Sequence, residues 1–160
     1  MRCPGCNGEF EDMSGPTHEY ILSSSACWAV YGEVLAREYS NPRMMQLHRV
    51  TVDAYAVQHP GVEVLPARRS VAIHLSRLYL LLEREWPITR INEAMPKISA
   101  FKDRCAWLTP PSMEGTLTVK SVLSAASNDE HEAAVMAWAE SVWQAWTPHH
   151  ATVRTWCAEL

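Results

Sequence analysis

Apolar residues recur every three to four positions along four stretches of this chain, which is the spacing of one face of an α-helix. The pattern predicts long helices over residues 26–39, 44–58, 68–85 and 129–146. No segment alternates apolar and polar residues long enough to form a sheet, since GVEVL and TLTV are too short. Proline-containing breaks, namely NPR, HPG and WP, follow the first three stretches. The sequence therefore predicts an all-α protein.

Shorter helices are predicted where prolines and small polar residues divide the second half of the chain. Ser127 and Glu130 have the spacing of a capping box at the start of the last long helix. The remaining predicted segments are 88–107, divided at Pro96, 118–126, capped by Thr118, and 149–158, which follows Pro148. Together these segments predict a helical bundle.

Residues 1–22 are predicted to form an irregular loop, because glycine and proline punctuate them and large apolar side chains are few. A chain of 160 residues is long enough for one domain with a core of its own. The expected organisation is a single domain over 1–160, with a metal-binding loop at 1–27 and a helical bundle over 26–160.

Composition narrows the classes of function. Hydrophobic residues make up 48% of the chain and charged residues 20%, which is ordinary for a soluble globular protein. The net charge of −4 and the lack of a basic patch argue against a nucleic-acid partner. No apolar run is long enough for a membrane span, and the N-terminus lacks a signal-peptide core. We therefore expect a cytoplasmic protein.

The sequence CPGC near the N-terminus has the spacing of a metal knuckle, in which two thiolates separated by a tight turn bind one ion. The next candidate ligands along the chain are His18 and Cys27, and Cys27 falls in the first turn of a predicted helix, where the helix dipole favours a thiolate. Three thiolates and an imidazole form a known structural zinc site. The sequence predicts that Cys3, Cys6, His18 and Cys27 bind zinc.

Two other interpretations of CPGC remain. A redox motif of the thioredoxin type should follow a strand and open a helix, whereas this one begins at residue 3 with no strand before it. Alternatively, the cysteines have no joint role. A loop with so little apolar surface would stay flexible unless something fixed it, and this favours the metal.

Polar side chains on the predicted 44–58 helix suggest a second site. At 100° per residue, His48, Tyr55 and His59 lie along one edge of the apolar arc, and Asp53 lies on the opposite, solvent side. His48 and His59 are 11 residues apart, or about 16 Å along the axis, so they cannot both bind one ion.

His74 lies in the middle of the apolar arc of the 68–85 helix, so it is predicted to be buried and to face Tyr55. His149 and His150 stand at a helix break, where their side chains can turn back into the bundle. Three imidazoles with an open position would form a catalytic metal centre. The alternative is that these histidines are hydrogen-bonded core residues. The candidate catalytic residues are His59, His74, His149, His150, Tyr55, Asp53 and His48.

Three other residues are expected to be bystanders. His131, between two glutamates at the start of a helix, is predicted to be solvated. Cys105 and Cys157 are predicted to be buried or free thiols.

The motifs CPGC, GPTH, ACWAVYGEVLAREYS, HRVTVDAYAVQHPG and PHHATVRTW give the chain a resemblance to a bacterial family of unknown function. The resemblance spans most of the chain, and it implies no known reaction. The motifs that carry it contain Cys3, Cys6, His18, Cys27, His48, Asp53, His59, His149 and His150.

Two functions of different class follow. The first is a zinc-binding helical protein with a structural metal and a histidine-lined pocket for a small molecule, or a surface for a protein partner. The alternative is a metal-dependent hydrolase or transferase that uses the histidine cluster. Neither involves nucleic acid or a membrane, and the sequence does not predict the oligomeric state.

Overall fold

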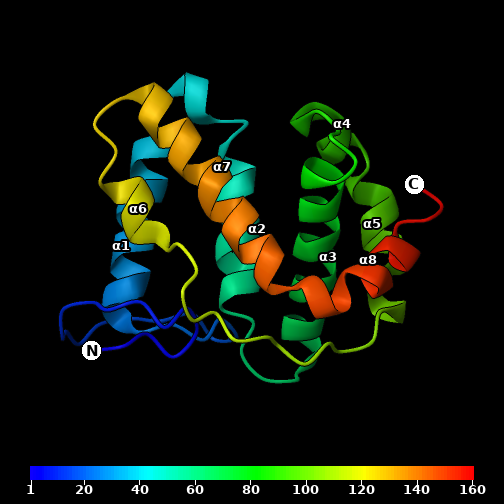
Figure 1. Ribbon diagram of the computed structural model, residues 1–160, viewed down its shortest axis with the longest axis horizontal. Coiled ribbons are helices and arrows are strands. Elements are labelled where there is room, and N and C mark those ends of the chain that lie inside the picture. The colour runs from blue at the N-terminus through cyan, green and yellow to red at the C-terminus, as the bar shows by residue number, and fades with distance from the viewer.

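The computed structural model describes residues 1–160 and contains eight α-helices and no strand, which confirms the all-α prediction (Figure 1). Three short 3-10 segments, η1 (Pro42–Met44), η2 (Lys102–Arg104) and η3 (Thr147–His149), extend or join helices. The helices are α1 (Ser25–Tyr39), α2 (His48–Gln58), α3 (Leu65–Leu82), α4 (Ile88–Glu93), α5 (Met95–Phe101), α6 (Val119–Leu123), α7 (Asn128–Ala145) and α8 (His150–Trp156).

Side-chain caps start three of these helices. The Ser24 hydroxyl accepts the Cys27 N–H at the start of α1, and the Thr118 hydroxyl caps α6. At α7, the Ser127 hydroxyl accepts the Glu130 N–H at 3.2 Å, as the capping box predicts. The Glu130 carboxylate reaches one residue further back than usual and accepts the Ala126 N–H at 2.8 Å.

The ends of α2 and α3 differ from the predicted ones. The predicted 44–58 helix becomes a 3-10 turn followed by α2, which begins only at His48. Helix α3 begins at Leu65, three residues before the predicted start. Pro66 fits in the first turn because backbone N–H groups there have no partner within the helix. It ends early because Glu85 adopts a positive φ of 50° and the Trp86 N–H donates to the Leu80 carbonyl.

Helix α2 occupies the centre of the molecule, between α7 and α3 (Figure 1). Nine of its eleven residues are buried, and Arg49 is the only exposed residue of the helix. The expectation that Asp53 faces solvent was therefore wrong, since this residue is only 3% exposed. Helical periodicity predicts a solvent side only for a helix that packs on one side.

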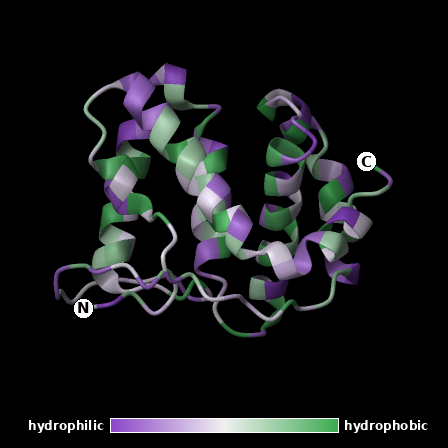
Figure 2. Ribbon diagram, in the orientation of Figure 1, coloured by the Kyte–Doolittle hydropathy of each residue, from purple (hydrophilic) through white to green (hydrophobic).

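Tryptophans on α7 and directly after it pack the core against α2. The buried Trp138 indole donates to the Gln58 side-chain oxygen at 3.0 Å, and the buried Trp146 indole donates to the Val57 carbonyl at 3.0 Å. Each ring thus contributes apolar area while its N–H has a partner. In Figure 2, hydrophilic residues, drawn in purple, occur in the first turns of α7 and in the N-terminal loop.

The N-terminal segment runs along one end of the bundle, next to the start of α1 (Figure 1). Hydrogen bonds join it to the bundle at scattered points. For example, Leu22 N–H donates to the His59 carbonyl at 3.1 Å, and the Lys120 ammonium donates to the Glu9 carbonyl at 2.7 Å. None of the helices has the length and apolar character needed to cross a membrane.

Candidate metal centre

The CPGC sequence folds into a tight knuckle. Asn7 N–H donates to the Cys3 carbonyl at 3.0 Å, and Cys3 N–H donates to the Gly8 carbonyl at 2.9 Å. Asn7 has a φ of 59°, a left-handed conformation that asparagine tolerates better than most residues. The turn buries the side chains of both Cys3 and Cys6.

Cys27 approaches this knuckle from the first turn of α1. Its N–H is capped by Ser24, and the Ser24 N–H in turn points at the Cys3 sulfur at 3.4 Å. The amide groups at a helix start stabilise negative charge, so they would help to stabilise a Cys27 thiolate bound to a metal ion.

His59 ends α2 and supplies the fourth group. Its Nδ1 lies 2.8 Å from the Tyr55 carbonyl, which can only accept, so Nδ1 carries the proton. Nε2 is then left with a free lone pair, and it faces the Cys27 sulfur at 3.4 Å. A carbonyl that fixes the tautomer of a histidine is the usual outer-shell partner of a metal ligand.

The donor atoms of Cys3, Cys6, Cys27 and His59 all lie within 4.8 Å of one another. The Cys6 and Cys27 sulfurs are 4.0 Å apart. Around a tetrahedral zinc ion, two sulfurs would be about 3.8 Å apart and a sulfur and a nitrogen about 3.6 Å apart. The cysteines are free, and a disulfide would need sulfurs at about 2.05 Å. The four groups could therefore hold one metal ion.

The three thiols shift one another's pKa values through hydrogen bonds. The pKa of Cys3 lies far below its ordinary value because Cys27 and Cys6 donate hydrogen bonds to it. The pKa of Cys27 is raised, chiefly by its hydrogen bonds to Cys3 and Cys6 and by burial. For Cys6, the hydrogen bond with Cys27 lowers the pKa, but the bond to Cys3 and burial outweigh it and raise the pKa to about 12. Three thiolates this close together would need a divalent ion to offset their mutual repulsion.

Two glycines let the backbone come close to this centre. A Cβ on Gly5 would overlap the Leu22 carbonyl oxygen and would lie 2.5 Å from Cδ2 of His59. Gly61, just after His59, has a φ of 72°, and a Cβ there would lie 2.8 Å from the Tyr20 carbonyl. Neither position has space for a side chain.

Comparison with protein families finds a match that covers residues 1–147 and therefore includes all four groups. The chain belongs to DUF5946, a family of unknown function. Comparisons with curated proteins and with solved structures gave no match.

In this member of DUF5946, His18 lies outside the cluster that the sequence predicted it would complete. Its ring packs against Tyr20 and Trp28, and its Nδ1 accepts the Tyr20 N–H at 3.3 Å. The structure brings His59 to the thiols instead. The sequence signal for His59 was weak: it placed His59 on the same helix edge as Tyr55, but nothing in it linked position 59 to position 27.

An aromatic stack backs the centre. The Tyr55 hydroxyl lies 3.4 Å from the Cys27 sulfur, and the Tyr55 ring stacks on both His59 and Tyr31. Burial raises the pKa of Tyr55, and charge at Cys27 adds to this effect, so the hydroxyl stays protonated and can donate to the sulfur.

The other predicted histidine contacts differ from the observed ones. His74 is half-buried and does not meet Tyr55. Its Nδ1 lies 2.7 Å from the carboxylate of Asp53, which also accepts hydrogen bonds from Arg77 at 3.0 Å. Two candidate residues, Asp53 and His74, are thus joined, but away from the thiols and from the remaining histidines.

A second buried cluster surrounds Glu38, which is fully buried. Its carboxylate is bound by His48 at 3.2 Å, by His131 at 2.9 Å and by the Thr51 hydroxyl. The prediction that His131 is solvated was wrong, since it is only 1% exposed. Its neighbours in sequence gave no indication of Glu38, which lies 93 residues earlier.

His149 and His150 lie at neither cluster. His149 Nε2 lies 2.8 Å from the Thr109 carbonyl, and His150 Nε2 lies 2.8 Å from the Trp143 carbonyl. The candidate histidines His48, His59, His74, His149 and His150 therefore have separate partners, and they do not gather around one open metal position. Cys105 and Cys157 are buried free thiols.

Proposed function

We propose that this protein binds one zinc ion through Cys3, Cys6, Cys27 and His59 and that the metal is structural. The observation that carries the proposal is the convergence of these four donor atoms within 4.8 Å. Zinc suits the set because it is borderline-soft, accepts thiolate and imidazole together, and prefers four-fold coordination.

A structural role is supported by the closed geometry. All four side chains are between 0% and 1% exposed, and four protein donors leave no position for water or substrate. The ligands come from three segments that are distant in sequence, namely the N-terminal knuckle, the start of α1 and the end of α2. An ion there would fasten the N-terminal segment to the bundle.

Metal analysis of the protein purified without a metal-binding tag tests this proposal. We expect one zinc per chain in the wild type. His59→Ala should weaken zinc binding by more than about 100-fold, whereas His18→Ala, the matched control, should bind as the wild type does. Equal zinc affinity in His59→Ala and the wild type would contradict the ligand set, and iron at one equivalent would contradict the choice of metal.

A further inference from the structure

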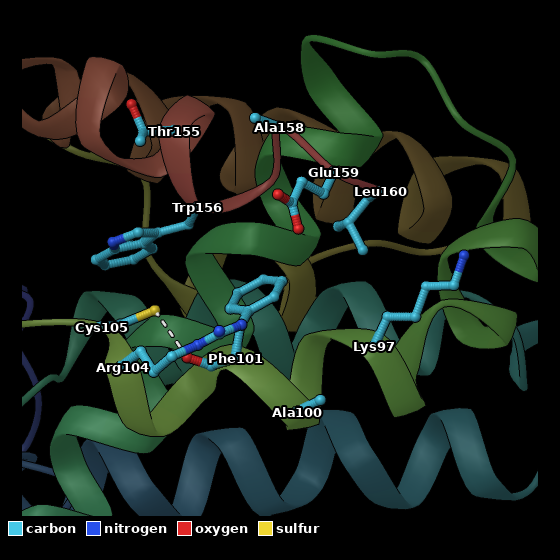
Figure 3. Close-up of a pocket in the computed structure, with 10 residues that line it drawn as sticks. All are labelled: Lys97, Ala100, Phe101, Arg104, Cys105, Thr155, Trp156, Ala158, Glu159 and Leu160. Atoms are coloured by element: carbon cyan, nitrogen blue, oxygen red, sulfur yellow. Dashed lines mark hydrogen bonds between the residues drawn. The ribbon is translucent and has the colours of Figure 1, made fainter.

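A cavity of about 610 Å³ lies at the other end of the molecule from the N-terminal segment, between α5, η2 and the α8 end of the chain (Figures 1 and 3). A volume of this size suits a small organic ligand. One wall comes from residues 155–160, beyond the part of the chain that matches DUF5946. The cavity therefore offers a function separate from the metal centre.

Apolar side chains form much of the lining. Phe101 from α5 and Trp156 from α8 both line the cavity, and both are half-buried against the core (Figure 3). Leu160, Ala100 and Ala158 also line it. An alkyl chain or a ring placed here would lose apolar contact with water and gain contact with the two aromatic faces.

The charged groups at the cavity are mainly positive and lack partners. Arg104 and Lys97 line it, and neither makes a hydrogen bond or an ion pair through its side chain. In contrast, Arg69 and Arg154 at nearby positions are paired with carboxylates. Both side chains are exposed, so they are free to pair with a bound anion.

Arg68 adds to the positive field, since its Nε is buried without a hydrogen-bond partner. Burial raises the pKa of Cys105, which lines the cavity, to about 11, and the positive charges of Arg104 and Arg68 act in the opposite direction. Both guanidinium groups are thus within electrostatic reach of the same wall. The only acidic side chain in the lining is Glu159.

We propose that this cavity binds an amphipathic organic monoanion, a carboxylate on an apolar chain or ring. The carboxylate lies beside Arg104, whose guanidinium gains a charged hydrogen-bond acceptor, and Lys97 adds positive charge from another part of the lining. The apolar part packs against Phe101 and Trp156. A single negative charge is specified because the Glu159 carboxylate, which projects into the same space in Figure 3, would repel a second one.

The test compares three probes of one chain length on the metal-loaded protein: octanoate, 1-octanol and octylammonium. Titration calorimetry at low salt should give the tightest binding for octanoate, by about tenfold over octylammonium, because only the anion pairs with the cations. Equal affinities for all three probes would show binding by apolar contact alone and would overturn the proposal.

Two variants locate the site. Arg104→Gln should weaken octanoate binding by about tenfold. The matched control is Arg49→Gln, which removes an exposed, unpaired arginine from α2 and should leave octanoate binding unchanged.

Ala100→Trp places a large ring in the cavity from an exposed position and keeps both cations, so it should abolish binding. Circular dichroism checks that each variant is folded, and wild-type affinity in folded Arg104→Gln or Ala100→Trp would overturn the proposal.

Discussion

At the scale of single residues, the metal centre depends on a residue that is not a ligand. Gly5 lies in the knuckle between the first two cysteines, in contact with Leu22 and the His59 ring. Any side chain at this position would have to displace either backbone or a proposed ligand. Flexible neighbours could move aside, but a carbonyl fixed by the chain cannot.

Gly5→Ala should therefore weaken zinc binding at least tenfold, because its Cβ would push the His59 ring away from the thiols. Zinc competition with a chromogenic chelator measures the affinity. Gly32→Ala on α1 is the control, since a Cβ there meets nothing within 4 Å. It should leave zinc affinity unchanged and stabilise the helix by about 0.5–1 kcal/mol. Unaltered affinity in Gly5→Ala would contradict the close approach of His59 to the knuckle.

The Glu38 carboxylate is fully buried, and Thr51, His48 and His131 are its hydrogen-bond partners. Glu38→Gln removes the charge and leaves an amide that cannot accept from all three donors. We expect a loss of about 3 kcal/mol in the free energy of unfolding, measured by urea denaturation. Glu33→Gln, an exposed change on the same helix, should cost little. Similar losses in the two variants would show that the cluster contributes nothing of its own.

At the scale of elements, the N-terminal segment and the helices are held by different forces. The helices have apolar faces that form a common core. Residues 1–22 have only four backbone N–H groups that donate to backbone carbonyls, so their order depends on the knuckle and on the metal that we propose.

Cys6→Ser should thus loosen residues 1–22 before it unfolds the bundle. Hydrogen exchange should show faster exchange in this segment and near His59, with little change in α3 and α7. Cys105→Ser, at a buried thiol outside the centre, should leave exchange in residues 1–22 as it is in the wild type. Protection that fell equally in all helices of Cys6→Ser would show that the centre and the bundle unfold as one unit.

At the scale of the whole molecule, the proposed ion links the chain start to the central helix. His59 ends α2, and α2 packs against both α3 and α7. An ion that binds only the folded protein stabilises it by mass action. Since the core is formed by helices, the metal-free protein should remain helical.

Chelation of the metal should lower Tm by about 10 °C without loss of helical signal at 25 °C, if the ion contributes about 4 kcal/mol. Differential scanning calorimetry with and without chelator measures the shift. His18→Ala should show the same shift as the wild type, and Cys6→Ser should show almost none. A wild-type Tm that does not respond to chelator would contradict a structural role for the metal.

The sequence by itself determined the features that depend on neighbouring residues. Helical periodicity, prolines and side-chain caps are local, so the all-α fold and the Ser127 cap were predictable. The knuckle was predictable because four residues define it. Cys27 was predictable as its companion because the start of α1 is also set locally.

Only the tertiary structure decided which histidine joins the thiols. His18 is closer in sequence to the cysteines, but the end of α2 carries His59 to them because α1 and α2 pack together. The same holds for Asp53, which periodicity assigned to solvent, and for His131, which was assigned to solvent because two glutamates flank it. Both are buried because other helices cover them. Contacts between distant segments depend on how faces are matched in packing, and a pattern read along one helix does not contain that information.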